Sequence, residues 1–399
     1  MERAWAGIDI GKGHHHVVVI DADEKQLLSR RMLNDEASIL ALIKEIGALA
    51  NTITWAVDIR TGPAVLVLAL LAAQDQEVLY ISSTVVNGVA KGYRGAAKTD
   101  ARDAAIIADQ ARMRRGMTVI HTHTEEAIEL RLLVARRKDL VADRTRAVNR
   151  LREMLLELWP ALECVLDLTT NGPLVLLTGY QQPADIRRLG VARLAAWLQA
   201  RGVRRHTDLA GKAVKAAKEQ SVTLPGSSVA GRLVAQLAQD LIALAERIDA
   251  VDQLLEERFR QHELAEIIES MPGIGHVLGA EFLAAVGGDL SDFTDAGHLA
   301  GYAGMSPVPR DSGRISGNMH RPRRYNRGLN RVFYMSALLS VRCDPASRRF
   351  YDRKRAEGKK HVQAVIALAR RRVNVLWALI RDRRCYVPDL AAARSGLAA

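Results

Sequence analysis

A heptad pattern over residues 233–259 constrains the fold more than any other feature of this sequence. Apolar residues alternate at spacings of four and three for about three heptads, the signature of a coiled-coil seam: Val234, Leu237, Leu241, Leu244, Ile248, Val251 and Leu255. Residues 126–159 repeat apolar positions every seven. We therefore expect two long helices that pair with each other or with another protomer. Residues 165–230 form an insertion between them to which the sequence assigns no role.

The N-terminal part alternates short β-type and helical patterns. Val- and Ile-rich runs bounded by Gly, Asp or Asn predict strands at 4–10, 16–22, 26–32, 53–58 and 77–82, and helical patterns occupy 36–49, 62–73 and 100–114. Three successive strands followed by alternating elements favour a mixed sheet covered by helices. This order fits an α/β RNase H-like fold better than a doubly wound sheet, which begins with a β-α-β unit.

A chain of 399 residues exceeds one ordinary core, so two or three domains are expected. We predict an α/β domain at 1–115, a helical coiled-coil region at 116–265 and a mostly helical domain at 266–399. No apolar run approaches the roughly 18 residues of a membrane span, and the first residues lack a signal-peptide pattern. The three scattered cysteines match no zinc spacing, so we expect a reduced, cytoplasmic protein without disulfides.

The positive charge of the chain is concentrated at its C-terminal end. Residues 301–399 hold 22 Lys or Arg and 6 Asp or Glu, a net charge of +16, whereas the first 300 residues hold 35 and 39, a net charge of −4. Such a concentration is typical of a surface that binds phosphate backbones. A solvated basic face that keeps the protein soluble is the alternative.

Two motifs introduce this basic segment. Pro272-Gly273-Ile274-Gly275 joins two helical patterns as in a helix-hairpin-helix, a turn that can offer the N–H groups of Gly273 and Gly275 to a phosphate. A plain helix–helix turn is the simpler interpretation. A Gly-, Pro-, Ser- and Arg-rich loop then runs from Gly301 into a helix near Arg327.

Four carboxylates in the N-terminal part are candidates for a divalent-cation site. Asp9 and Asp58 each end a predicted strand, and Asp100 and Asp103 share one face of a predicted helix. An RNase H-like sheet would bring these elements together, and carboxylate oxygens are the ligands that Mg²⁺ prefers. Taken alone, such acids are usually turn, cap or helix-start residues. The consecutive His14, His15 and His16 alternate between strand faces, so we expect no metal ligands among them.

These motifs, in this order, resemble the DEDD transposases of bacterial insertion sequences, which are related to the Piv DNA invertases and include bridge-RNA-guided recombinases. The resemblance runs from about residue 4 to about 375 and rests on "GIDIGK", "VDIRTG", "AKTDARDA", "RRKDLVADRTRAVNRL", "MPGIG" and "GYAGMSPVPRDSG". It implies a RuvC-like RNase H fold for the first domain and a transposase domain at the C-terminus.

The resemblance implies catalytic roles for five residues. Asp9, Asp58, Asp100 and Asp103 would hold Mg²⁺ or Mn²⁺, with Asp58 standing where the family usually has Glu. Ser312 would be the nucleophile that forms a phosphoserine link to DNA, and Ser316 is its near competitor. Since the acids and the serine lie in different predicted domains, the resemblance implies a site assembled between domains or between protomers.

The resemblance also implies partners. We expect donor and target DNA, a structured non-coding guide RNA, a homo-dimer or homo-tetramer formed through the coiled coil, no membrane, and a location at the bacterial nucleoid. Basic residues expected to grip nucleic-acid phosphates are Lys98, Arg310, Arg314, Arg321, Arg323, Arg324 and Arg327.

Three other functions have weaker support. A sugar kinase of the actin-like class would share the "GIDIGK" turn, but the chain has no second Gly-rich phosphate loop and such a kinase needs no basic C-terminal segment. A metal-dependent nuclease of the Holliday-junction-resolvase kind would use water instead of Ser312. A non-enzymatic DNA- or RNA-binding scaffold becomes conceivable because Asp58 departs from the usual Glu.

Overall fold

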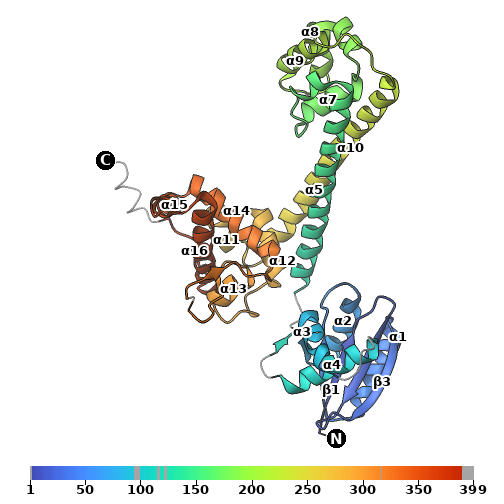
Figure 1. Ribbon diagram of the computed structural model, residues 1–399, viewed down its shortest axis with the longest axis vertical. Helices are drawn as coiled ribbons and strands as arrows, with labels where there is room; N and C mark the ends of the chain where they lie inside the picture. Colours follow the sequence, from blue (N-terminus) through green and yellow to red (C-terminus); the bar gives the residue numbers. More distant parts are fainter. Residues whose placement is uncertain (1, 94–98, 115–116, 121–123, 315, 389–399) are drawn as a thin grey trace. The chain divides into compact units, whose positions relative to one another are not determined.

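The chain divides into two compact units, Met1–Thr122 and His123–Ala399. The computed structural model (Figure 1) describes residues 2–93, 99–114, 117–120, 124–314 and 316–388. The expected three-domain division stays a prediction, because these contacts separate only the first unit from the rest. Lys98 lies outside the described residues.

A six-stranded mixed sheet in the order β3-β2-β1-β4-β5-β6 organises the first unit (Figure 1). The strands are β1 (Arg3–Asp9), β2 (His14–Ile20), β3 (Gln26–Leu33), β4 (Thr52–Val57), β5 (Val78–Tyr80) and β6 (Thr118–Val119). The helices are α1 (Glu36–Gly47), α2 (Val65–Ala73), α3 (Ser83–Val89) and α4 (Asp100–Met113). The central strand β1 pairs antiparallel with β2 and parallel with β4.

The contact between α4 and β1 is unusually close at Gly7. A Cβ atom on Gly7 would lie 2.2 Å from the backbone oxygen of Ala104 and 2.4 Å from the backbone nitrogen of Ala108. Glycine inside a strand often marks such an approach of two backbones. Because Ala104 directly follows Asp103 in the helix, this contact fixes the first turn of α4 near the C-terminal end of β1.

Two long helices, α5 (Glu125–Leu158) and α10 (Ser227–Gln261), pack side by side in the second unit (Figure 1). They run antiparallel, since Arg137 pairs with Asp252 and Arg258 pairs with Glu129 at 3.3 Å. Apolar side chains of both helices contribute to two separate hydrophobic cores, one at each end of the helix pair. Leu130, Val134, Leu255 and Phe259 belong to the C-terminal core, whereas Leu151, Leu155, Val234 and Leu241 belong to a distal one.

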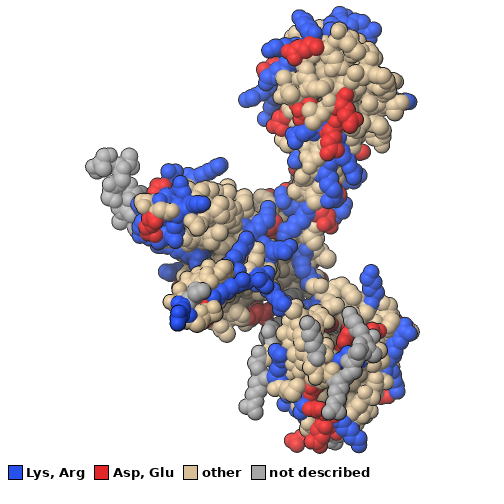
Figure 2. Space-filling view, viewed as in Figure 1, with Lys and Arg blue, Asp and Glu red and all other residues tan. Residues whose placement is uncertain are grey.

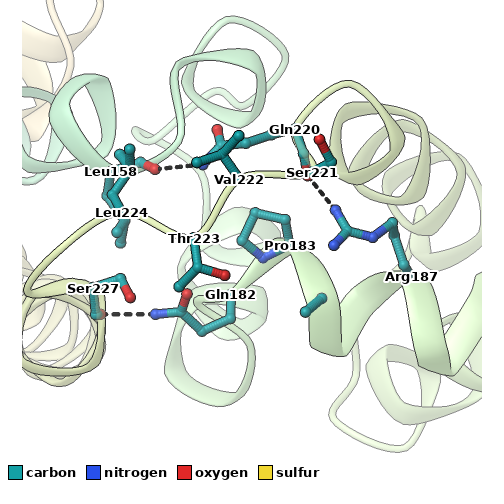
Figure 3. A pocket seen from close by; sticks show the side chains of 11 residues that line it. Leu158, Gln182, Pro183, Arg187, Gln220, Ser221, Val222, Thr223, Leu224 and Ser227 are labelled. Atoms are coloured by element: carbon teal, nitrogen blue, oxygen red, sulfur yellow. Dashed lines mark hydrogen bonds between the residues drawn. The ribbon is translucent and has the colours of Figure 1, made fainter.

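The distal core lies in a helical cap made by the insertion together with the short helix that directly precedes it. Its helices are α6 (Pro160–Glu163), α7 (Asn171–Gly179), α8 (Pro183–Gln199) and α9 (His206–Lys218). Side-chain amides fasten the cap to the ends of the long helices (Figure 3): Gln220 donates to the Leu158 carbonyl at 3.0 Å, and Gln182 donates to the Ser227 carbonyl at 2.7 Å. The cavity beside them measures only about 10 Å³, room for a single water at most, so this region is a joint and not a ligand site.

The C-terminal part of the second unit is helical apart from one short hairpin. Its elements are α11 (Ala265–Glu269), α12 (His276–Val286), α13 (Ala296–Tyr302), β7 (Val308–Pro309), β8 (Met319–His320), α14 (Arg327–Cys343), α15 (Pro345–Ala356) and α16 (His361–Arg381). A buried guanidinium ties three of its segments together: Arg372 of α16 donates to the Ser336 hydroxyl at 2.9 Å and to the Pro272 carbonyl. Burial lowers the pKa of Arg372 to about 10.

The expected mixed α/β N-terminal sheet and largely helical remainder are confirmed. No helix in the described part of the chain combines the length and hydrophobicity needed to traverse a bilayer. The five predicted strands lie within about two residues of β1–β5, whereas α3 and β6 were not predicted. Both are short, and β6 has only two residues, so neither carries a periodic pattern.

Replacing Gly7 with Ala should destabilise the first unit, because the added methyl group collides with the α4 backbone. We expect the free energy of unfolding to fall by about 1–3 kcal/mol or more, measured by urea denaturation. Gly47→Ala is the matched control, since a Cβ atom there meets nothing within 4 Å. Equal stabilities of the two variants would contradict the close-packing account.

Candidate active site

Asp9 and Asp58 end two neighbouring strands of the sheet. The parallel register pairs Ile8 with Val57, so the two aspartates follow paired residues at the same edge. Both side chains are half-buried. Carboxyl ends of parallel strands are where open α/β sheets commonly place ligands.

Asp58 is the most perturbed acid at this edge. Its Oδ1 atom is buried and has no hydrogen-bond partner, while Ser83 donates its hydroxyl to the Asp58 carbonyl at 3.2 Å. Burial raises the pKa of Asp58, and the negative charge of Asp103 raises it further, although a hydrogen bond with Ser83 opposes the shift. The charge of Asp103, in the first turn of α4, therefore acts on Asp58 in the same direction as its burial.

Asp100 and Asp103 lie in the first turn of α4. Thr99 caps this helix by accepting a hydrogen bond from the Arg102 N–H at 3.3 Å, as expected of a threonine N-cap. Asp103 is half-buried and Asp100 is exposed. Acids here also complement the helix dipole, so their position by itself does not distinguish catalysis from helix stabilisation.

The sequence pattern did not indicate the contact between His14 and Asp100. The His14 Nε2 atom lies 3.4 Å from an Asp100 carboxylate oxygen, and its Nδ1 atom lies 2.8 Å from the Arg31 guanidinium. His16 stands opposite Asp9 in the antiparallel register of β1 and β2. The strand register that creates these contacts is not visible in the spacing of the histidines.

The donor chemistry of this carboxylate edge suits a hard divalent cation. All four candidates are carboxylates, and Asp58 offers a buried oxygen without a hydrogen-bond partner. In the described part of the chain, no three His, Cys, Asp or Glu side chains lie close enough together to form a ready metal site. The edge is thus a convergence of two strand ends and one helix turn, and not a closed cage.

Ser312 lies in the second unit, in the loop that joins β7 to β8. The Arg310 N–H donates to the Asn318 carbonyl and the Asn318 N–H donates to Asp311 Oδ1, both at 2.9 Å, and these bonds close the loop. Gly313 and Gly317 adopt positive φ angles of 55° and 74°, which a tight turn requires. Ser312 and Ser316 are both exposed, so the loop offers two hydroxyl groups to solvent.

The predicted phosphate-binding arginines near this loop are at least partly exposed: Arg310, Arg314, Arg321, Arg323, Arg324 and Arg327. Figure 2 shows many further Lys and Arg side chains over the C-terminal helices. Arg321 is held in place, since its guanidinium stacks 4.7 Å from the centre of the Tyr325 ring and donates to Asn330 at 3.1 Å. Tyr325 packs against Gly304 as well, and these contacts account for its ring.

The Pro272–Gly275 turn joins α11 to α12 as expected. A Cβ atom on Gly273 would lie 2.7 Å from the Ser336 carbonyl oxygen, so this glycine is required for packing against α14. Gly275 is exposed and caps α12. Packing therefore explains Gly273, and phosphate binding by Gly273 and Gly275 stays a prediction.

The protonation of Asp58 should make stability depend on pH. Burial raises the pKa of Asp58 in the folded chain, so ionisation of Asp58 lowers the free energy of unfolding. This stability is lost as the pH rises from the ordinary pKa of an aspartate through the raised pKa. Asp58→Asn should therefore melt at a higher temperature than the parent chain at pH 7 in a chelator. This difference should vanish below a pH of about 4. A lower melting temperature for Asp58→Asn at pH 7 would contradict the burial account.

Two regions of the chain match family models of known proteins. Residues 6–160 match a family model of IS110-type DEDD transposases, and residues 265–352 match the model described as transposase IS116/IS110/IS902 family. The insertion element IS900 uncharacterized 42 kDa protein of Mycobacterium paratuberculosis is 52% identical over 98% of this chain and 99% of its own length.

Two further relatives are more distant. The mini-circle putative transposase for IS117 of Streptomyces coelicolor is 30% identical over 98% of each chain. The pilin gene-inverting protein of Moraxella bovis is 33% identical over 31% of this chain and 38% of its own length.

Proposed function

Because the chain belongs to the IS116/IS110/IS902 family of transposases, we propose that it cleaves and rejoins DNA through Ser312 with the help of a Mg²⁺-binding carboxylate set. The set comprises Asp9, Asp58, Asp100 and Asp103 on a sheet that we propose is RNase H-like. The observation that carries the proposal is the buried Oδ1 atom of Asp58, which has no hydrogen-bond partner, at the edge where β1 and β4 end.

The carboxylates supply the charge that phosphoryl transfer needs. When bound, Mg²⁺ or Mn²⁺ would polarise the scissile phosphate and neutralise charge on the leaving oxygen. Asp9 and Asp58 offer oxygens from rigid strand ends, and Asp100 and Asp103 offer them from the capped end of α4. Sites built on strands and helices hold their ligands more accurately than sites on loops.

Ser312 supplies the nucleophile in this proposal. Its hydroxyl loses a proton and its Oγ atom bonds to phosphorus while the bond from phosphorus to one deoxyribose oxygen breaks, and the released sugar oxygen gains a proton. The phosphoserine ester keeps one phosphodiester link per cleaved strand, so a sugar hydroxyl of another strand can reverse the step and rejoin the DNA. The exposed arginines around the loop would hold the phosphate backbone by bidentate hydrogen bonds.

Sequence choice and assembly complete the proposal. The family resemblance supports a structured guide RNA, with the arginines gripping backbone and not reading bases. The exposed apolar side chains Leu132, Val141 and Leu254 on α5 and α10 support a homo-oligomer formed through these helices. A single RNA species that copurifies with the protein would separate this function from that of a resolvase-like nuclease.

Ser312→Ala should abolish the covalent protein–DNA adduct and lower strand cleavage by at least about 10³-fold, because the nucleophile is missing. A denaturing gel of protein incubated with Mg²⁺ and a supercoiled plasmid carrying the insertion element measures the adduct. Ser316→Ala is the matched control and should retain it. An adduct that persists in Ser312→Ala ends the assignment, and hydrolysed ends without any adduct in the parent chain favour water attack.

Divalent cations should stabilise the first unit through Asp58. Adding MgCl₂ or MnCl₂ at about 100 times the dissociation constant should raise the free energy of unfolding by about 2.7 kcal/mol, read as a melting-temperature shift. Asp58→Asn and Asp103→Asn should lose the shift. Asp143→Asn, which removes a carboxylate of α5 that pairs with Arg146, should keep it. Equal shifts in all variants would place the cation elsewhere.

A further inference from the structure

The cap carries a strongly cationic face that the proposed catalytic site does not use. Residues 183–218, which span α8 and α9, contain nine Lys or Arg and only two Asp, a net charge of +7. All nine side chains are at least partly exposed: Arg187, Arg188, Arg193, Arg201, Arg204, Arg205, Lys212, Lys215 and Lys218. In Figure 2 blue side chains border the cap along α8 and α9. This segment lies between the two regions that match the family models.

Most of these cations have no acidic partner among the described residues. Arg188 pairs with Asp185 at 3.1 Å and Lys212 pairs with Asp208 at 2.8 Å. Three others donate to backbone carbonyls and are thereby held in place: Arg187, Arg193 and Arg201. The remaining four are not engaged by any described acid or carbonyl: Arg204, Arg205, Lys215 and Lys218.

Two of these cations, Arg204 and Arg205, directly precede α9, and the other two, Lys215 and Lys218, lie in its last turn. The helix buries one face against the distal core, including Leu209, Ala213 and Val214, and leaves the lysines outside. At about 1.5 Å of rise per residue, Arg205 and Lys218 lie roughly 20 Å apart along the axis. Since one strand of a duplex advances about 3.4 Å per nucleotide, this face matches the length of about six phosphates.

A broad cavity of about 550 Å³ lies at the N-terminal end of this face and is lined by Arg204, Arg205 and Lys212. Two acids line it as well, but both are engaged. Asp208 pairs with Lys212, and Asp167 accepts from the Thr169 N–H at 3.0 Å and from its hydroxyl at 2.6 Å. The three cations and two carboxylates leave the lining of the cavity with a net charge of +1.

We propose that this face binds the phosphodiester backbone of nucleic acid and forms a second binding surface besides the arginines near Ser312. A protein partner fits less well, because protein interfaces are depleted of Lys and enriched in aromatic residues, whereas the α9 part of this face is mainly Lys and Arg. Backbone binding needs neither the serine nor the metal, so the inference stands or falls independently of the catalytic proposal.

The test is a salt titration of binding with Ser312→Ala protein in a chelator. The probes are fluorescein-labelled 40-base-pair duplex DNA and duplex RNA of the same length, followed by anisotropy. A variant with Arg204→Gln, Arg205→Gln, Lys215→Gln and Lys218→Gln should bind more weakly. The slope of log K against log salt should fall in magnitude by up to about 3.6 for DNA, because each phosphate that a cation neutralises adds about 0.9 to the slope. A larger weakening with one probe identifies whether DNA or RNA occupies the face.

The matched control removes four positive charges outside the cap from residues that have acidic partners: Arg30→Gln, Arg146→Gln, Arg258→Gln and Arg260→Gln. We expect its slope to stay close to that of the parent. A second measurement uses protein with an unaltered cap. The extent of acetylation of Lys215 and Lys218 by a soluble reagent is compared with and without nucleic acid, and bound nucleic acid should protect both lysines. Equal slopes in the two variants, or unprotected lysines at saturation, would overturn the proposal.

Discussion

The approach of α4 to β1 at Gly7 is the constraint on which the first unit depends. With no side chain between them, the backbones of the helix and the central strand come into contact, and the helix start then has only one place to lie. Asp9 and Asp58 sit at that end because β1 and β4 run parallel in register. The strand register therefore places Asp9 and Asp58, and the packing contact at Gly7 places the first turn of α4 with its two acids.

The sequence predicted most elements of this unit, because Val- and Ile-rich runs mark β1–β5 and helical patterns mark α1, α2 and α4, whereas α3 and β6 are too short to be marked. Short strands of Val and Ile and the helix beginning at Asp100 lie where the patterns put them. Side-chain neighbours could not be read in the same way: the contact between His14 and Asp100 depends on strand register and on helix position together. The buried Oδ1 atom of Asp58 was equally hidden, since burial is decided by the whole fold. Gly7 was the available signal, as a glycine inside a strand pattern.

The heptad pattern predicted two long helices but could not choose their partner. The structure pairs α5 with α10 in the same chain and buries Val234, Leu241 and Leu255 at the two ends, whereas Leu244, Ile248 and Val251 in the middle stay half-buried. A stripe of apolar residues predicts that one face of a helix is buried, but it does not indicate which element packs against that face. The insertion was unassigned because its proposed function lies in surface charge, which leaves no periodic pattern.

Because α5 and α10 run antiparallel, the length of this helix pair can change without changing how the chain connects to the C-terminal core. The chain leaves the C-terminal core near Glu129 and returns to it near Arg258, and these two points stay the same for any length of the helix pair between the core and the cap. Seven residues added to each helix would move the cap outward by about 10 Å and keep the apolar stripe in phase. The helix pair thus works as an adjustable spacer, along which evolution can change the reach of the cap in whole-heptad steps without disturbing the core at its base.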